Sequence, residues 1–187
     1  MKKQLLFILI LINALPILAQ RPADQAQLKA DISFLASDAM KGRLTGSIYQ
    51  DIAAEFIASR FLEIGLKTKG DKNSYLQTFY YAPSADPHNT ANLSIHSGDS
   101  VKIINVAGYI DNGGQSTIII GAHYDHLGEG TSSFSLSAEG GIHNGADDNS
   151  SGVSLMLQLA QSLSKVKSKY NYLFLAFSGE EFGLWGS

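Results

Sequence analysis

The feature that most restricts the fold of this chain is a short β-branched run, Thr117-Ile118-Ile119-Ile120, that stops abruptly at Gly121. His123 and Asp125 follow almost at once. An open α/β sheet delivers polar side chains to its edge in this way, and its ligand sites lie at that edge. The run therefore predicts an α/β protein with a functional site where this strand ends.

Two pairs of adjacent carboxylates occur further along the chain. Asp147 and Asp148 open a helical pattern. Glu180 and Glu181 follow an apolar strand predicted over residues 172–177. Two carboxylates packed together ionise cheaply only when a cation lies beside them. Zinc binds imidazole and carboxylate ligands and keeps a position open for water in catalytic sites. Because the chain has no cysteine, a metal site here must consist of His, Asp and Glu.

The remaining periodicity predicts helices and strands that form one domain. Apolar residues at helical spacing predict helices over residues 25–40 and 49–64, and a third that runs from a cap at Asn149 or Ser150 to Leu163. Strands are expected at residues 75–82, 91–95, 101–110, 116–121 and 172–177. The sequence Asp111-Asn112-Gly113-Gly114 predicts a hairpin between the third and fourth of these strands. We therefore expect an α/β fold with a mixed, mostly parallel central sheet flanked by helices.

The first residues resemble a targeting segment rather than part of the fold. Lys2 and Lys3 form a basic start before the unbroken apolar run Leu5–Ile12. Cleavage after Ala19 would remove residues 1–19 as a signal peptide. An uncleaved membrane anchor is the alternative, but the run is short for a membrane span. We expect an exported protein, periplasmic or extracellular, without stable membrane association after cleavage.

The composition of the chain indicates a globular domain and gives no sign of a nucleic-acid partner. A hydrophobic content of 44% in 187 residues suits one domain with a substantial core. The net charge is −3 and no basic stripe is present, so the sequence does not indicate binding to nucleic acid.

Three motifs in order resemble those of the two-zinc exopeptidases, the family of aminopeptidase Y, aminopeptidase S and the bacterial leucyl aminopeptidases. They are His123-Tyr124-Asp125-His126-Leu127-Gly128, Gly145-Ala146-Asp147-Asp148-Asn149-Ser150-Ser151-Gly152 and Phe177-Ser178-Gly179-Glu180-Glu181. The upstream Gly42-Arg43-Leu44-Thr45-Gly46-Ser47 resembles an N-terminal loop of the same family. The resemblance runs from about Leu28 to Ser187 and implies a three-layer sandwich, incomplete at the C-terminus, that binds two Zn²⁺ ions.

The resemblance also implies a role for each residue of the site. His123 would bind one zinc ion, Asp147 would bridge both, and Glu181 would bind the second. Glu180 would be the general base that takes a proton from the bridging water, and Asp125 would orient His123. Two metal ions that share a water lower its pKa and polarise the scissile carbonyl. These roles describe an aminopeptidase that hydrolyses the N-terminal residues of peptides.

Two details of the family motif complete the expected site. The family implies a cis peptide bond between Asp147 and Asp148, with Asp148 following that bond rather than binding metal strongly. Among the other histidines, His143 is a weak candidate for a metal contact. His126 is expected to be structural, and His88 and His96 to be solvated.

The chain departs from the family pattern after the Glu180-Glu181 pair. Family members carry a further Asp and a further His as zinc ligands downstream, and this sequence reaches Ser187 without them. Residues 20–187 are therefore expected to be the N-terminal portion of a single zinc peptidase catalytic domain. We expect the chain ending at Ser187 to be poorly soluble and to show no measurable aminopeptidase activity.

Other functions remain open on the same residues. A single-zinc glutaminyl cyclase-like acyltransferase is the nearest enzymatic alternative, and a carboxypeptidase is a further one. A catalytically inactive peptidase-like binding module belongs to a different class. The segment of residues 42–47 has two interpretations, a turn between helices or a loop near the mouth of the site, of which the turn is favoured.

Overall fold

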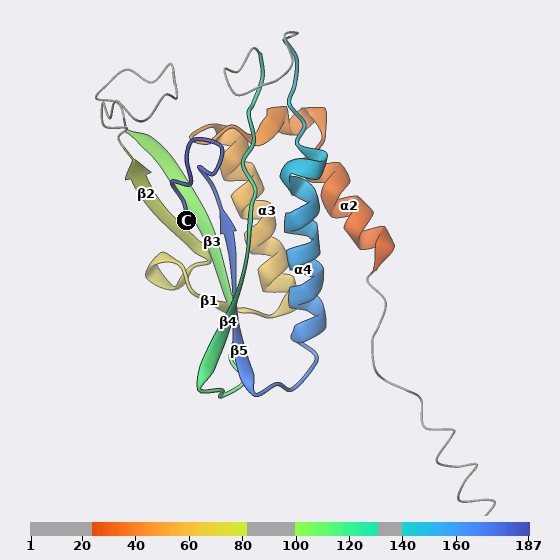
Figure 1. Ribbon diagram of the computed structural model, residues 1–187, viewed down its shortest axis with the longest axis vertical. Coiled ribbons are helices and arrows are strands. Elements are labelled where there is room, and N and C mark those ends of the chain that lie inside the picture. Colours follow the sequence, from red (N-terminus) through yellow and green to blue (C-terminus); the bar gives the residue numbers. More distant parts are fainter. Residues whose placement is uncertain (1–23, 82–99, 131–139) are drawn as a thin grey trace, which may run out of the picture.

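The computed structural model describes residues 24–81, 100–130 and 140–187 (Figure 1). The expected signal peptide, the strand expected at residues 91–95, and His88 and His96 lie outside these ranges. Within them, the structure has no helix with the length and apolar character that crossing a membrane requires.

The helices begin and end mostly where local sequence signals place them. They are α2 (Gln25–Leu35), α3 (Ile48–Ile64) and α4 (Gly152–Leu163), with the 3₁₀ turns η1 (Asp38–Arg43) and η2 (Asp71–Asn73) and the π-helical turn η3 (Ala146–Ser151). The Asp24 carboxylate accepts the N–H groups of Ala26 and Gln27 and so caps α2. Gly65 ends α3 in the left-handed conformation that a glycine adopts without steric cost. The first helix is shorter than expected, because α2 ends at Leu35 and the chain turns into η1.

The sheet is mixed, as expected from the sequence. Its strands are β1 (Lys67–Thr68), β2 (Leu76–Tyr81), β3 (Val101–Ile110), β4 (Ser116–His123) and β5 (Tyr170–Phe177). The order is β1-β3-β5-β4, and β2 pairs with β3 beside β1. Among the described strands only β4 and β5 run parallel, while β3 is antiparallel to its three neighbours. Antiparallel pairings therefore outnumber parallel ones in this part of the sheet, against the expected proportion.

The predicted hairpin between β3 and β4 is wrong, because β5 lies between these two strands. Asn171 at the start of β5 explains the connection. Its Oδ1 accepts the N–H groups of Asn112 and Gly114, and its Nδ2 donates to the carbonyl oxygen of Gly114. The turn therefore crosses over the beginning of β5 instead of closing a hairpin. A turn signal in the sequence is local and carries no information about a strand inserted from elsewhere in the chain.

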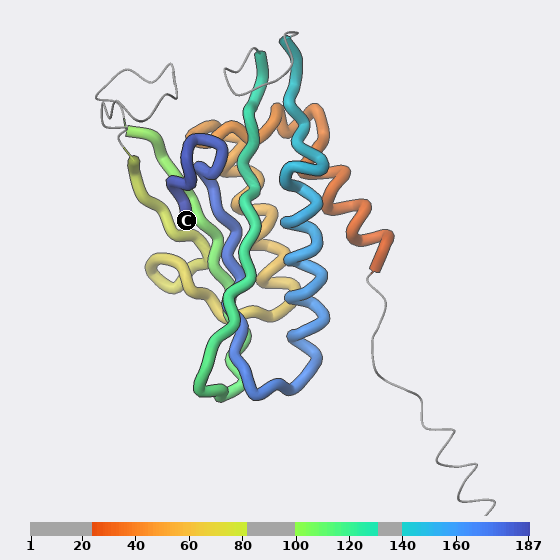
Figure 2. Tube along the Cα trace, viewed as in Figure 1, coloured from red at the N-terminus to blue at the C-terminus, as the bar shows by residue number. Residues whose placement is uncertain are grey.

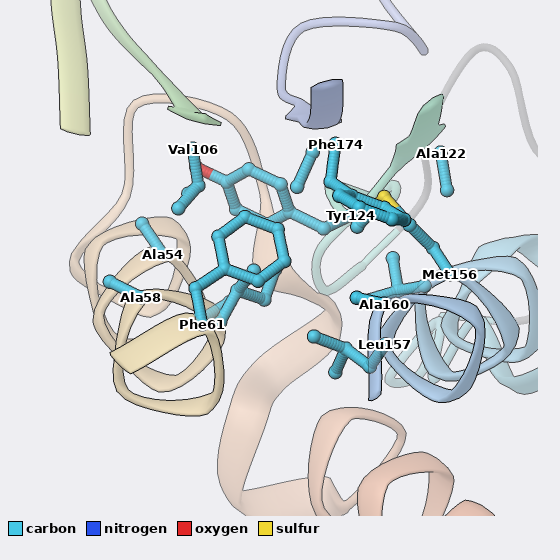
Figure 3. Packing of buried hydrophobic residues seen from close by; sticks show 14 of the residues in the cluster. Ala54, Ala58, Phe61, Val106, Ala122, Tyr124, Met156, Leu157, Ala160 and Phe174 are labelled. Carbon is cyan, nitrogen blue, oxygen red and sulfur yellow. The ribbon is translucent and has the colours of Figure 1, made fainter. Parts of the chain in front are cut away.

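The helices α2, α3 and α4 all lie on one side of the sheet (Figures 1 and 2), so the described residues form two layers rather than the expected three. Alternate side chains of β5, among them Phe174 and Ala176, are buried against these helices. Figure 3 shows Phe174 in one cluster with Phe61 of α3 and Leu157 of α4. Both β3 and β5 have partners on each edge, so these two strands form the centre of the described sheet.

The parallel pair of strands determines where polar side chains gather. His123, the last residue of β4, lies opposite Phe177, the last residue of β5. The N–H of Tyr124 continues the pairing by donating to the carbonyl oxygen of Phe177 at 2.8 Å. The segments that follow both strands therefore leave the sheet at the same edge, which is where parallel strands place ligand sites.

Candidate active site

The three polar clusters of the sequence meet at this edge. His123 is nearly buried, with 12% of its side chain exposed. Its Nε2 lies 3.0 Å from Asp148 Oδ1 and 4.0 Å from Glu180 Oε2. The predicted convergence of the segments after β4 and β5 with the start of the next helix is therefore found in the structure.

Among the described residues, two groups of side chains have the ligand types and spacing that a metal ion requires. The first consists of His123, Glu180 and Glu181, and the second of His126, Asp148 and Glu181. Within each group the candidate ligand atoms lie within 4.8 Å of one another. His126 Nδ1 lies only 2.5 Å from Glu181 Oε1. Imidazole nitrogen and carboxylate oxygen are ligands that zinc takes, so the donor set fits a zinc site.

Asp147, the expected bridging ligand, is in neither group. Asp147 is exposed. The carboxylate that lies against His123 is that of the neighbouring Asp148. The expected cis bond is also displaced by one position: the structure has its cis peptide at Asp148–Asn149, so the expectation for Asp147–Asp148 is wrong here. The sequence motif locates this stretch of the chain but contains no local preference that separates adjacent peptide bonds or adjacent carboxylates.

Asp125 contacts His123, as expected, and also the segment that carries the two glutamates. It is fully buried, and its Oδ1 lies 3.6 Å from His123 Nδ1. The other contacts of its carboxylate include the Thr45 hydroxyl, which donates at 2.8 Å. The backbone N–H groups of Glu180 and Glu181 donate to it at 3.3 and 3.4 Å. Asp125 therefore joins the histidine segment to the backbone of the two glutamates.

The charge state of His123 follows from its carboxylate neighbours. Burial of the ring by itself lowers the pKa of His123. The carboxylates outweigh burial, Asp125 most strongly and then Glu180 and Asp148, and raise this pKa to about 9. At neutral pH the metal-free protein therefore carries a proton on His123. That proton must leave before the ring binds a metal.

In the metal-free protein, His123 is expected to titrate with a pKa near 9 in an NMR titration. Because the folded pKa lies above the unfolded value of about 6.5, the interaction stabilises the fold fully below about pH 6.5. This stability is lost as the pH rises through the folded pKa. Urea unfolding at several pH values should show the loss in the wild type and not in His123→Ala. An ordinary His123 titration near pH 6.5 would contradict the arrangement of the carboxylates.

The turn that carries the two glutamates is fixed from beneath by buried polar groups. The Ser178 hydroxyl donates to Gln50 Oε1 at 2.6 Å, and the Ser178 N–H donates to Asn105 Oδ1 at 3.3 Å. The Gly179 N–H donates to the Thr45 hydroxyl oxygen at 3.1 Å. Sequence reasoning missed these supporting residues. Their partners are distant in the chain, since Ser178 and Gln50 are separated by 128 positions.

Thr45→Val should lower the free energy of unfolding by about 1–3 kcal/mol, because it leaves the Gly179 N–H without its acceptor and removes the hydroxyl donor of the Asp125 carboxylate. The shape of the side chain is nearly unchanged. Urea denaturation measures the effect, and Thr78→Val on the exposed side of β2 is the control. Equal stabilities of the two variants would show that the Thr45 hydroxyl does not hold the turn.

The segment of residues 42–47 connects two helices and also contacts the site. The favoured interpretation of this segment as a simple turn was therefore incomplete. The N–H of Gly128 donates to the Gly42 carbonyl oxygen at 3.1 Å, and Leu44 forms a parallel bridge with His126. Gly42 has a φ of +68°, and a Cβ there would lie 2.5 Å from the Gly128 oxygen. Only glycine suits this close approach. The following Arg43 is fully buried beneath the site.

A cavity of about 250 Å³ opens beside His123 and Glu180. Phe177, Gly121 and Ala122 form its apolar part, and Asn149 adds a polar group. A substrate group held there would lie next to the first of the two groups of candidate ligands. His143, by contrast, is in neither group and contacts the Gly130 carbonyl oxygen through its Nε2 at 2.9 Å.

Comparison with known proteins places similar sequences among the peptidases. Residues 105–187 match the family model described as Peptidase family M28. The alkaline phosphatase isozyme conversion protein of Escherichia coli K12 is 29% identical over 147 residues, which are 78% of this chain and 40% of that protein. This chain therefore spans less than half the length of that relative.

Two solved structures show the same fold. Fimbriiglobus ruber glutaminyl cyclase has a TM-score of 0.66 at 19% identity, and the match covers 90% of this chain and 50% of the cyclase. A Zn-dependent exopeptidase from Parabacteroides distasonis has a TM-score of 0.62 at 17% identity, and the match covers 88% of this chain and 50% of the exopeptidase. At these identities the likeness concerns the fold alone. The chain thus has a mixed α/β fold found in zinc-dependent exopeptidases and glutaminyl cyclases, and part of it matches a peptidase family.

Proposed function

We propose that this chain belongs to an exported zinc-dependent aminopeptidase that hydrolyses the N-terminal residues of peptides. The observation that carries the proposal is the meeting of His123, Glu180 and Glu181 at the edge where β4 and β5 end. The match of residues 105–187 to a peptidase family supports hydrolysis of a peptide bond. The cavity beside Glu180 provides space for part of a substrate.

His123 is the proposed ligand of one zinc ion, and Glu181 is the proposed ligand of the second. His123 Nε2 is the atom available to a metal, because Nδ1 faces the Asp125 carboxylate and carbonyl oxygen. Asp147 is proposed as the bridging ligand from the motif, whereas the geometry favours Asp148, whose carboxylate already lies at His123 Nε2. Bound zinc would supply a Lewis acid that lowers the pKa of a water molecule and polarises a carbonyl group.

Glu180 is the proposed general base. Its side chain is 36% exposed, lies 4.0 Å from His123 Nε2 and lines the cavity, so it can face a water molecule there. Burial raises the pKa of Glu180, the nearby His123 opposes this, and Glu181 adds to it. A carboxylate with a raised pKa accepts a proton from water more readily near neutral pH. Glu180 would then return this proton to the leaving amine.

A glutaminyl cyclase-like acyltransferase is the second candidate, because such enzymes share the fold. The two groups of candidate ligands that share Glu181 favour a site with two metal ions over a single-zinc site. The presence of both groups also argues against an inactive binding module, since a site that has lost its chemistry does not require carboxylates and histidines so close together.

The test uses the protein encoded by the complete reading frame that contains this sequence, purified free of metal. Expected is zinc-dependent release of the N-terminal residue from unblocked peptides, with no cleavage of N-acetylated peptides of the same sequence. Peptides that begin with glutamine distinguish the cyclase, which would form an N-terminal pyroglutamate without releasing a residue. Pyroglutamate formation without hydrolysis would contradict the proposal, as would inactivity towards both peptides despite bound zinc.

Export is proposed from the basic start and apolar run of residues 1–19. Fractionation of the producing cells should find the protein outside the cytoplasm, and N-terminal sequencing should then begin at Gln20. Retention of the intact N-terminus on the membrane would instead support the uncleaved anchor.

A further inference from the structure

Arg43 is fully buried, yet its guanidinium forms no ion pair with any described carboxylate and donates to backbone carbonyl oxygens instead. Nε donates to Tyr124 O at 2.7 Å. Nη1 donates to Asn144 O at 2.8 Å and to Leu35 O, and Nη2 donates to Gly145 O at 3.0 Å. One planar group therefore connects the end of α2 with two segments that are far from it in the sequence.

Those two segments carry the candidate metal ligands. Tyr124 lies between His123 and Asp125, and its carbonyl group belongs to the peptide that joins Tyr124 to Asp125. Gly145 lies three residues before Asp148. A Cβ at Gly145 would lie 2.7 Å from Arg43 Nη2, so the absence of a side chain there allows the close approach. The guanidinium thus fixes the separation of the backbone segments that bring histidine and carboxylate together.

The guanidinium also places a positive charge beneath the site, and its hydrogen bonds go to backbone carbonyl oxygens rather than to the candidate metal ligands. Burial of a charge without an ion pair costs several kcal/mol, and carbonyl dipoles offset only part of this. Because the donors of Arg43 are engaged by carbonyl oxygens, Asp148 and Glu181 remain available to a metal.

We propose that Arg43 is a positioning residue that holds the two ligand-bearing segments at their metal-binding separation before any metal is bound. The proposal rests on the proposed zinc site. Lysine cannot replace this function, because an ammonium group keeps the charge but lacks the planar fork of donors that reaches several carbonyl oxygens in one plane.

The direct test compares zinc affinity, by competition with a chelator, in the wild-type protein from the complete reading frame and in its Arg43→Lys variant. We expect Arg43→Lys to bind zinc about 10–100-fold more weakly than the wild type, which is the usual effect of changing a group that orients metal ligands. The Co²⁺ absorption spectrum should also change shape, because the ligand geometry is altered. Arg60→Lys is the matched control: Arg60 is another nearly buried arginine, on α3, that contacts Asp31 and Glu63 away from the site. It should lower the stability and leave both metal readouts unchanged.

A measurement on the wild type makes the test independent of whether the variant folds. In the metal-free protein the Arg43 Nε–H should give a resolved NMR signal that exchanges slowly with water and changes little when zinc is added. Protection that appears only with zinc would overturn the proposal, as would equal zinc affinity and Co²⁺ spectra for the wild type and Arg43→Lys. Failure of the wild type to bind zinc would overturn the proposed function together with this role. Normal zinc binding with an unaffected Arg43→Lys variant overturns this role alone.

Discussion

Glu180→Gln is expected to keep zinc bound and to lower turnover by about 10²–10⁴-fold, because it removes proton transfer and little else. Glu181→Ala is expected to lower the zinc affinity itself, because Glu181 belongs to both groups of candidate ligands. Turnover of an unblocked peptide and zinc affinity, measured on the protein from the complete reading frame, separate the two roles. Glu55→Gln, an exposed change on α3, is the control and should alter neither quantity.

The opposite result would exchange the roles of Glu180 and Glu181 as general base and metal ligand. Glu180 also lies in the first group of candidate ligands, so the structure allows it to bind a metal directly. Loss of zinc in Glu180→Gln, with zinc retained in Glu181→Ala, would therefore contradict the proposed base and make Glu180 the ligand.

Leu157→Ala should lower the free energy of unfolding by about 2–5 kcal/mol, the range found for large-to-small changes in protein cores. Leu157 is fully buried in α4, where it packs into the cluster between the helices and the sheet (Figure 3). Leu155→Ala is a matched control on the same helix, because Leu155 is 53% exposed. Its effect should stay within about 0.5 kcal/mol. Equal destabilisation by both changes, in urea denaturation, would show that α4 does not pack through this face.

Local patterns were sufficient for most helices and strands of the fold, although they gave no sign of β1 and extended the first helix beyond Leu35. The strand expected at residues 101–110 has the bounds of β3, and the expected stop at Gly65 ends α3. Both features depend on neighbours in sequence, through alternating side chains or through the conformation of one glycine. The strand order and the layers depend instead on contacts between distant residues. The insertion of β5 between β3 and β4 therefore had no signal that sequence periodicity could reveal.

The same division applies to the site. The meeting of His123, Glu180 and Glu181 was predictable because each lies at the end of an apolar strand or just after it, where polar side chains are conspicuous. Arg43 and Thr45 were not, because their partners are distant: Arg43 contacts Tyr124 across 81 positions and Thr45 contacts Asp125 across 80. A clue existed in the sequence, since the segment of residues 42–47 resembles a family loop, but only the structure shows these side chains buried beneath the candidate ligands.

The most direct test of the zinc site is a crystal structure of the zinc-soaked protein with anomalous scattering recorded at the zinc absorption edge. We expect a zinc peak about 2.0–2.1 Å from His123 Nε2 and zinc–oxygen contacts of about 2.0–2.2 Å at Glu181. The same map shows whether Asp147 or Asp148 supplies the shared carboxylate. A structure in which zinc binds elsewhere, with His123 and Glu181 free of metal, would contradict the account.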